Sequence, residues 1–372
     1  MRIPLVLGLL FWGGLGLGAE VCPTPKVTQP RWAQGFAFEA GPGYKLVRVK
    51  TPWQDSEEVF SYLILSPGCP KPAAYSTTPT FAPNPQRLVA LSTTDLPILV
   101  ILGLEDRLVA TTDFAYVNSP EVRARIEAGK LEEVHYELEG ELEHLVMLKP
   151  DLVLGFALSD KSARPKEALG RLGVQLVLTA GYMEESPLGR AEWILMVAAF
   201  FGLEEKAVAH MDQVSGDYLA WAAKANQTPT RPQVFVGSEF KGIWYVPGGR
   251  TYQSQLLKDA GARYLWAEDP QRGSLHLDFE ALLAQASEVP FWLNPGNWTN
   301  LKPIESQPAF QGFLAVRTGQ VYSYTKKLNP KGGNDYWETG SVYPNRVLKD
   351  LISLFHPELL PGYQTLWYKR LQ

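Results

Sequence analysis

The chain carries many side chains that could act as acids, bases or nucleophiles, but they do not form the pattern of a known catalytic centre. The sequence has no Gly-x-Ser-x-Gly, no His-Glu-x-x-His, no phosphate-binding loop and no dinucleotide-binding glycine motif. A glycosidase would need two carboxylates beside an aromatic cleft, and the 39 Asp and Glu residues show no recognisable pair. We therefore do not expect an enzyme, and a secreted glycan-acting enzyme is the least favoured alternative.

The densest group of possible metal ligands lies in one short stretch that contains His135, Glu137, Glu139, Glu141, Glu143 and His144. Alternating carboxylates of this kind usually form a solvated acidic surface. Receptors for bare zinc or manganese instead gather several histidines in one cleft, whereas the five histidines of this chain are scattered. We expect no metal site, and a zinc or manganese receptor remains the alternative function.

Aromatic side chains are the most unusual part of the composition, since 11 Trp, 16 Tyr and 16 Phe make up 12% of 372 residues. Trp and Tyr provide wide apolar contact at a low entropy cost, which suits a large, rigid ligand. The formal net charge of −4 argues against a sequence-independent nucleic-acid binder, which would need a basic surface. These features favour a small-molecule binding protein.

The N-terminus has the features of an export signal. Arg2 is followed by an uncharged apolar stretch up to Leu17, and then by small residues ending at Ala19. This pattern predicts a secretory signal peptide over residues 1–19, and hence a location in the periplasm or cell envelope. The alternative is an uncleaved anchor, although the apolar stretch is slightly short for a membrane span.

The two cysteines, Cys22 and Cys69, both lie close to this export signal. In an oxidising compartment, the expected arrangement is one disulfide that closes a long loop. The competing interpretation is that Cys22 is the lipidated first residue of a lipoprotein. The preceding residues, Ala19-Glu20-Val21, fit a lipidation signal poorly.

The elements that must position these residues follow from hydrophobic periodicity. Residues 44–50 and 59–65 alternate as in a β-hairpin, and the Pro-rich residues 67–85 form a strap. Short apolar strands then alternate with helical stretches, which indicates a parallel α/β sheet. Pro187 opens about forty helical residues interrupted only at Gly202, and a second α/β pattern follows.

We therefore predict an α/β protein of two α/β lobes joined by one long rigid helix, with an N-terminal β-hairpin extension. The predicted divisions are the signal peptide (1–19), the extension and strap (20–85), the N-terminal lobe (86–186), the connecting helix (187–226) and the C-terminal lobe (227–372).

Three segments of the first lobe carry a resemblance to a known family. They are residues 87–92, which read Arg-Leu-Val-Ala-Leu-Ser, residues 102–109, which read Leu-Gly-Leu-Glu-Asp-Arg-Leu-Val, and residues 142–154, in which a helix and a strand flank Lys149-Pro150-Asp151. From about residue 87 to the C-terminus, the chain resembles the periplasmic substrate-binding proteins of ABC importers for ferric siderophores, haem and vitamin B12, the class with a helical backbone. Residues 244–249 and 332–338 look like a subgroup with an N-terminal β extension.

The resemblance implies two lobes that close little on a ligand in the cleft between them, and one surface glutamate per lobe that docks on arginines of the permease. Glu143 and Glu280 match these glutamates, although the family's preceding Asn-Leu reads Glu141-Leu142 here. A carboxylate at a helix N-terminus is favoured by the helix dipole and stays available for an arginine. The simpler interpretation is that both residues only complete capping patterns.

Ligand contacts are expected on loops that follow the C-terminal ends of parallel strands. Four clusters lie there, at residues 92–95, 113–116, 244–250 and 334–337. With Tyr136, which precedes the docking helix, they give the candidates Ser92, Thr93, Phe114, Tyr116, Tyr136, Trp244, Tyr245, Arg250, Tyr336 and Trp337. The resemblance aligns Phe114 with a ligand-contacting aromatic position of the vitamin B12 binders, and Arg250 is the candidate partner of an anionic chelate.

The resemblance thus implies the solute-binding component of an ABC importer for an iron chelate (siderophore or haem) or cobalamin. The protein needs no cofactor of its own, although its ligand would carry chelated iron or cobalt. The expected partners are the permease subunits and the small-molecule chelate, with no nucleic acid, and the protein is expected to be a monomer.

Overall fold

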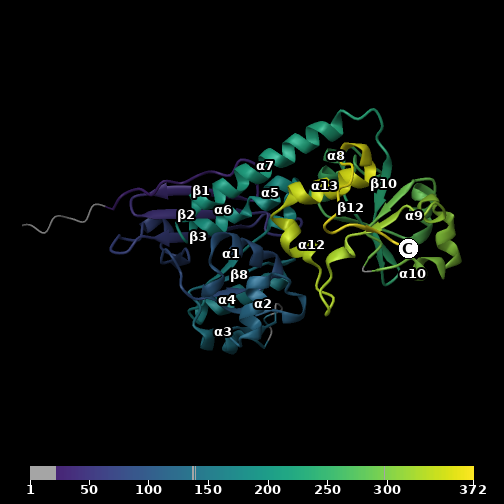
Figure 1. Cartoon of the computed structure of the whole chain (residues 1–372). Coiled ribbons are helices and arrows are strands. Elements are labelled where there is room, and N and C mark those ends of the chain that lie inside the picture. The colour runs from purple at the N-terminus through teal and green to yellow at the C-terminus, as the bar shows by residue number, and fades with distance from the viewer. Residues whose placement is uncertain (1–21, 136–137, 139, 297) are drawn as a thin grey trace, which may run out of the picture.

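A computed structural model of the chain describes residues 22–135, 138, 140–296 and 298–372 (Figure 1). The predicted signal peptide and Tyr136 lie outside the described residues. Over the described part, no helix is both long and apolar enough to cross a membrane.

The first lobe is built on a parallel sheet of short apolar strands. It has the order β7-β6-β5-β8-β9 and contains β5 (Leu88–Ala90), β6 (Leu108–Thr112), β7 (Glu132–Val134), β8 (Leu152–Gly155) and β9 (Leu176–Leu178). The connecting helices are α1 (Leu96–Leu102), α2 (Pro120–Glu127), α3 (Leu142–Leu148) and α4 (Asp160–Arg171). Because helices cover both faces, β5 and β8 are buried at every position and read as continuous apolar runs. The predicted α/β alternation is confirmed here.

The second lobe repeats this plan with additions that the sequence did not reveal. Its main sheet has the order β13-β10-β15-β16-β17, with β10 (Gln233–Val236), β13 (Arg263–Tyr264), β15 (Phe291–Leu293), β16 (Val321–Ser323) and an antiparallel edge strand β17 (Lys369–Arg370). A separate antiparallel sheet contains β11 (Ser238–Phe240), β12 (Ile243–Pro247) and β14 (Ser274–Leu277). The helices are α8 (Tyr252–Asp259), α9 (Phe279–Ala286), α10 (Lys302–Glu305), α11 (Leu314–Arg317), α12 (Asp335–Glu338) and α13 (Pro344–Phe355).

The segment that joins the lobes consists of three helices rather than one. They are α5 (Pro187–Ala191), α6 (Trp193–Ala199) and α7 (Glu204–Asn226). The predicted interruption falls at Gly202, whose φ of 66° is left-handed. Ala207 and Met211 of α7 belong to the core of the first lobe, whereas Tyr218 and Ala222 belong to that of the second. The α7 helix therefore bridges the two lobes, as Figure 1 shows.

The N-terminal extension is larger than the predicted hairpin. The predicted strands are β2 (Tyr44–Lys50) and β3 (Val59–Leu65), and they form a four-stranded sheet with β1 (Phe36–Gly41) and β4 (Thr80–Phe81). This sheet packs on α6, where the Phe36 and Trp193 rings are 5.2 Å apart. The buried carboxylates of Glu184 and Glu192 accept hydrogen bonds from backbone N–H groups of residues 31–35. The extension is therefore an integral part of the first lobe's core.

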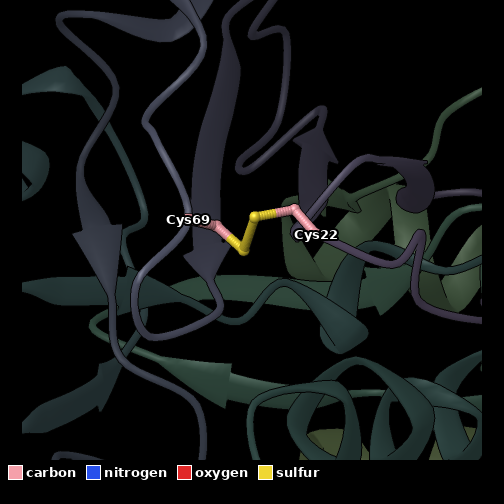
Figure 2. Close-up of a disulfide and its surroundings, with 2 residues drawn as sticks. All are labelled: Cys22 and Cys69. Atoms are coloured by element: carbon pink, nitrogen blue, oxygen red, sulfur yellow. A yellow bond between two sulfur atoms is a disulfide. The ribbon is translucent and has the colours of Figure 1, made fainter. Parts of the chain in front are cut away.

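The predicted disulfide between Cys22 and Cys69 is present, with 5.8 Å between the two Cα atoms (Figure 2). It lies against the turn between β1 and β2, where Gly43 has a φ of 77°. A Cβ atom at residue 43 would stand 2.5 Å from the Cys69 side chain. The turn thus needs glycine both for its backbone conformation and for the close approach of the disulfide.

Replacing both cysteines with serine is expected to destabilise the N-terminal sheet by about 2–4 kcal/mol, because the disulfide closes a loop with a sequence separation of 47 residues. Chemical denaturation of the double variant, compared with the oxidised wild type, measures this loss. Reductant should lower the stability of the wild type to that of the variant and leave the variant unchanged. Equal stability of the oxidised wild type and the variant would contradict the prediction.

Candidate functional site

Two adjoining cavities lie between the lobes, with volumes of about 310 and 360 Å³. Ser92, Phe156 and Trp337 line both of them, so they form one cleft. Ser92 follows β5 and Phe156 follows β8, at the C-terminal edge of the parallel sheet of the first lobe. Trp337 comes from α12 of the second lobe. The cleft therefore lies where the strand-end loops of one lobe face the other lobe, as ligand sites of open α/β sheets do.

Aromatic side chains form much of the wall of the first cavity. Besides Phe156 and Trp337, the lining includes Tyr182, Trp193 and Tyr252. The Tyr182 hydroxyl is fixed by hydrogen bonds to the backbone oxygens of residues 52 and 157, at 3.1 and 2.6 Å. Such rings offer a large apolar contact surface, and their side chains lose little conformational entropy when a ligand binds.

Asp95 is a buried and strongly perturbed carboxyl group of the cleft. Its side chain lines the first cavity although the residue is only 3% exposed. Burial raises the pKa of Asp95 to about 7, and a hydrogen bond with Thr179 opposes this shift. Among the described residues, no group hydrogen-bonds to its buried Oδ2 atom. A carboxyl with an unfilled hydrogen-bonding position therefore stands at the wall of the cleft.

Arg190, on α5, provides positive charge in the same cavity. Its guanidinium lies 4.4 Å from the centre of the Tyr252 ring, which is a cation–π contact. Within the described part of the chain, no carboxylate lies within ion-pair distance of this guanidinium. Arg190 is therefore available to an anionic or carbonyl group of a ligand.

Contacts across the cleft hold the two lobes together. Glu338 of the second lobe is 1% exposed and accepts hydrogen bonds from the backbone N–H groups of Asn118 and Ser119, at 2.6 and 2.8 Å. Burial raises the pKa of Glu338, and these hydrogen bonds oppose the shift. The Asn329 amide donates to the backbone oxygens of residues 115 and 117. The lobes are thus connected by direct polar contacts in addition to the linking helices.

Three of the four predicted strand-end clusters meet in the cleft. Ser92 and Thr93 come from the first, Tyr116 from the second and Trp337 from the fourth. Phe114 belongs to the second cluster but does not line either cavity, because its ring packs against the core of the first lobe. Tyr336 also lies outside both cavities, since it is 5% exposed and stacks on Tyr324 at 4.7 Å.

The third cluster does not reach the cleft, contrary to expectation. Trp244 is 2% exposed and packs against Trp292 in the core of the second lobe. Tyr245 contacts His276 across the antiparallel sheet, with ring centres 4.7 Å apart. Arg250 is paired with Glu185 at 2.7 Å and lines neither cavity. In this structure all three side chains lie away from the two cavities, because tertiary packing and ion pairing occupy them.

Arg190, Phe156, Tyr182 and Tyr252 line the cleft but were not predicted. One signal in the sequence could have indicated Arg190. Between Pro187 and Gly202, Arg190 and Glu192 are the only charged residues of an otherwise apolar helical stretch. Charged residues in a buried segment need a partner or a function. Glu192 has its partners in the N-terminal extension, whereas Arg190 faces the cleft.

The two candidate docking glutamates stand in equivalent places. Glu143 lies in the first turn of α3 and Glu280 in the first turn of α9, and both are exposed. Asp278, rather than Glu280, caps α9 by accepting a hydrogen bond from Ala281 N at 2.7 Å. Among the described contacts, neither glutamate side chain caps its helix, so capping does not explain the presence of either residue.

The acidic stretch before α3 does not form a metal site among the described residues, which contain no group of three or more suitable ligands. His144 Nδ1 lies 3.2 Å from a Glu141 oxygen, and His135 Nε2 lies 4.0 Å from the other. Glu137 and Glu139 lie outside the described residues.

Comparison with known proteins gives a family match and several relatives. A family described as periplasmic binding protein matches residues 88–328. An uncharacterized lipoprotein of Methanocaldococcus jannaschii is 28% identical over 201 residues, which are 53% of this chain and 46% of that protein. The chain thus spans about half the length of this relative. An uncharacterized ABC transporter substrate-binding lipoprotein of Bacillus subtilis is 24% identical, over 72% of this chain and 82% of that protein.

Solved structures share the fold. A periplasmic binding protein from Veillonella parvula has a TM-score of 0.59 and 17% identity, and the match covers 82% of this chain and 97% of that one. A periplasmic heme binding protein from Pseudomonas aeruginosa has a TM-score of 0.56 and 19% identity, covering 77% and 98%. At these identities the likeness concerns the fold of the two lobes.

Proposed function

Because the chain belongs to the periplasmic binding protein family, we propose that it is the solute-binding component of an ABC importer and holds a metal chelate between its lobes. The family predicted from residues 87–92, 102–109 and 142–154 is thereby confirmed, as is the two-lobed α/β fold. The importer role is consistent with the Bacillus subtilis relative, which is named as an ABC transporter substrate-binding lipoprotein.

The observation that carries the proposal is the cleft itself. Its walls combine six aromatic rings with the guanidinium of Arg190, which has no ion-pair partner among the described residues, and with the strand-end hydroxyls of Ser92 and Thr93. Binding pockets for large rigid molecules have this composition, mostly apolar with a few polar groups that orient the ligand. The ligand class we propose is an iron chelate, either a siderophore or haem, or cobalamin. Binding alone accounts for this arrangement, so no chemical step is proposed.

Titration of the purified protein with ferric siderophores, haemin and cobalamin tests this function. Trp337 lines both cavities, so a bound chelate is expected to quench tryptophan fluorescence, and Trp337→Phe should remove a large part of that quenching. If none of these chelates produces quenching or heat of binding, the proposed ligand class is wrong.

Docking on the permease is proposed for Glu143 and Glu280. Exposed carboxylates at the start of α3 and α9 are available for bidentate pairing with arginines of a partner. We expect the double variant Glu143→Ala, Glu280→Ala to lower chelate uptake by cells by at least about tenfold, because two interfacial charge pairs are lost.

Chelate affinity of the purified double variant should remain unchanged, since neither glutamate lines the cleft. The matched control replaces two other exposed glutamates, Glu205→Ala and Glu358→Ala, and should transport normally. Normal uptake by the docking variant would show that these glutamates do not contact the permease.

Export to the periplasm or cell envelope is proposed from the signal peptide expected over residues 1–19. Three curated relatives are named lipoproteins. In this chain, however, the sulfur of Cys22 is bonded to Cys69, so it is not available as a lipid attachment site. A secreted, disulfide-bonded protein is therefore the proposed form.

A further inference from the structure

We propose that the cleft selects a metal chelate of low net charge whose periphery carries amide groups. The inference rests on the proposed function and specifies its ligand class. It follows from two independent observations, the charges that line the cleft and the buried polar atoms that lack partners there.

The charge of the cleft is low and of mixed sign. Only Asp95, Asp113 and Arg190 are charged among the residues that line the two cavities. Two more arginines of the second lobe, Arg250 and Arg272, are both held by the carboxylate of Glu185. Arg190 is therefore the one cation on the described walls, and the two aspartates face the same space.

This balance disfavours a strongly anionic ligand. A ferric tris-catecholate keeps three negative charges, because each catecholate carries two against the three of the iron. Haem brings two propionates. Burial of such charges is unfavourable unless each one is paired, and one guanidinium opposed by two carboxyls cannot pair them. A ferric tris-hydroxamate is neutral, because its three hydroxamates together balance the iron.

The polar atoms of the cleft point to the same class. Thr112 Oγ1 and Asn334 Nδ2 belong to residues of the second cavity, Asp95 Oδ2 belongs to the first, and all three are buried without a hydrogen-bond partner among the described residues. Asp95 and Thr112 are only 3% and 4% exposed. Buried polar atoms are rarely left unpaired. Six other such atoms are spread over the described residues, whereas these three belong to residues of one cleft, where a ligand would complete them.

An amide group supplies both the hydrogen-bond donor and the acceptor that these atoms lack. Its N–H can donate to the carboxyl of Asp95, and its carbonyl oxygen can accept from the amide of Asn334 or from Arg190. Asp95 belongs to the first lobe and Asn334 to the second, so the ligand must present such groups on opposite sides. Linear and cyclic hydroxamate siderophores have amides around the metal, and so do the side chains of cobalamin. The shared chemistry is thus a nearly neutral, amide-bearing chelate.

Isothermal titration calorimetry of the full chain at neutral pH tests the charge selection. The four probes are a ferric tris-hydroxamate, cyanocobalamin, haemin and a ferric tris-catecholate. We expect the hydroxamate or cyanocobalamin to bind at least about 100-fold more tightly than the tris-catecholate and haemin. The tighter binder of these two probes shows whether the amide groups belong to a hydroxamate siderophore or to cobalamin.

Two variants of Asp95 test the hydrogen bond. Asp95→Leu has a similar size and no acceptor, and is expected to weaken binding of the neutral chelate by about tenfold or more. Asp95→Asn keeps an acceptor oxygen without the charge, and should bind within about threefold of the wild type. Arg190→Gln should lose about tenfold, whereas Arg263→Gln, an exposed arginine on β13, should change nothing.

Each outcome has a defined meaning. If the tris-catecholate or haemin binds most tightly, the selection for low charge is wrong while the importer function stands. If Asp95→Asn loses as much affinity as Asp95→Leu, the ligand is recognised by charge rather than as an amide donor. If no chelate binds at all, the proposed function fails and the inference with it.

Discussion

Replacing Asp95 with asparagine is expected to make the ligand-free protein more stable at about pH 8, by up to about 4 kcal/mol. The carboxyl is 3% exposed, and burial raises its pKa from the ordinary value of 3.8 to about 7. Above that pH the folded protein must hold an ionised carboxylate in a poorly solvated place. Asparagine has the same shape without the charge, so this unfavourable contribution disappears.

The direction of the pH dependence follows from the same shift. Because the pKa of Asp95 in the folded protein lies above its ordinary value, the folded state keeps the proton at pH values where the unfolded chain has lost it. The contribution of this group to the free energy of unfolding therefore falls as the pH rises from about 4 to about 7. Above about pH 7 the loss is complete.

Chemical denaturation of the wild type and Asp95→Asn at about pH 5 and about pH 8 measures this effect. The stability difference should be largest at the higher pH and lose more than half of its size at the lower one. Asp55→Asn, which changes an exposed aspartate of the N-terminal extension, serves as the control and should show no such pH-dependent difference. A stability difference that is independent of pH would contradict a raised pKa at Asp95.

A buried carboxyl that is expected to lower stability, and that lines the cleft, is better explained by the proposed binding role than by a role in folding. Proteins commonly retain such groups at functional sites and compensate for them elsewhere. Asp350 makes a useful contrast, since it is also fully buried but accepts hydrogen bonds from the backbone N–H groups of residues 366–368. The carboxylate of Asp350 has a structural role in the second lobe, whereas Asp95 keeps one oxygen unpaired among the described residues at the cleft.

The fold could be predicted from the sequence where local pattern and tertiary structure agree. The apolar strands β5 and β8 and the proline that opens α5 are visible in the sequence, because buried parallel strands read as apolar runs and proline suits the first helical turn. The short strands β11, β14 and β17 could not be predicted. A strand of two to four residues is too short to show a clear alternation of apolar and polar residues. These strands form because they pair with a neighbouring strand that is already in place.

The site could be predicted in part, for a related reason. Parallel topology requires strand-end loops to meet at one edge, so the sequence pattern alone is enough to place Ser92 and Tyr116 near one another. Trp337 lies on α12 of the second lobe, and its place opposite them was implied only by the family resemblance. Which of two arginines faces the cleft depends on ion pairing. Arg250 is neutralised by Glu185, a residue 65 positions away, and Arg190 has no such partner among the described residues. The ion pair of Arg250 cannot be read from the sequence, whereas the apolar surroundings of Arg190 between Pro187 and Gly202 are the one local signal.

Trp244 shows a different limit. Its position in a strand-end cluster suggested the cleft, but β12 alternates, with Ile243 exposed and Trp244 and Val246 buried. Period-two alternation can be read from the sequence, whereas the face that meets the core cannot be read without knowing what packs against it. The core of the second lobe packs on the Trp244 side, where rings from β15 and α9 surround the indole.

Glu338→Ala is expected to destabilise the protein by about 3 kcal/mol, because two buried N–H groups of the first lobe lose their acceptor. Glu338 is 1% exposed and binds the N–H groups of Asn118 and Ser119 at the start of α2. Since Glu338 lies on α12 directly after the cleft residue Trp337, the same contact fixes one wall of the cleft relative to the other. Its loss should therefore also weaken chelate binding.

Thermal unfolding and hydrogen exchange of the backbone amides together test the role of Glu338. In Glu338→Ala, the amides of Asn118 and Ser119 should exchange faster, while those of the N-terminal sheet should be unaffected. Glu338→Gln keeps one acceptor oxygen in place and should lose about half as much stability. If exchange at these two amides stays slow in the alanine variant, Asn329 and its bonds to the backbone of residues 115 and 117 hold the lobes together without the carboxylate. If Glu338→Ala shows fast exchange at these amides but keeps its chelate affinity, the contact between the lobes stabilises the protein without fixing the geometry of the cleft.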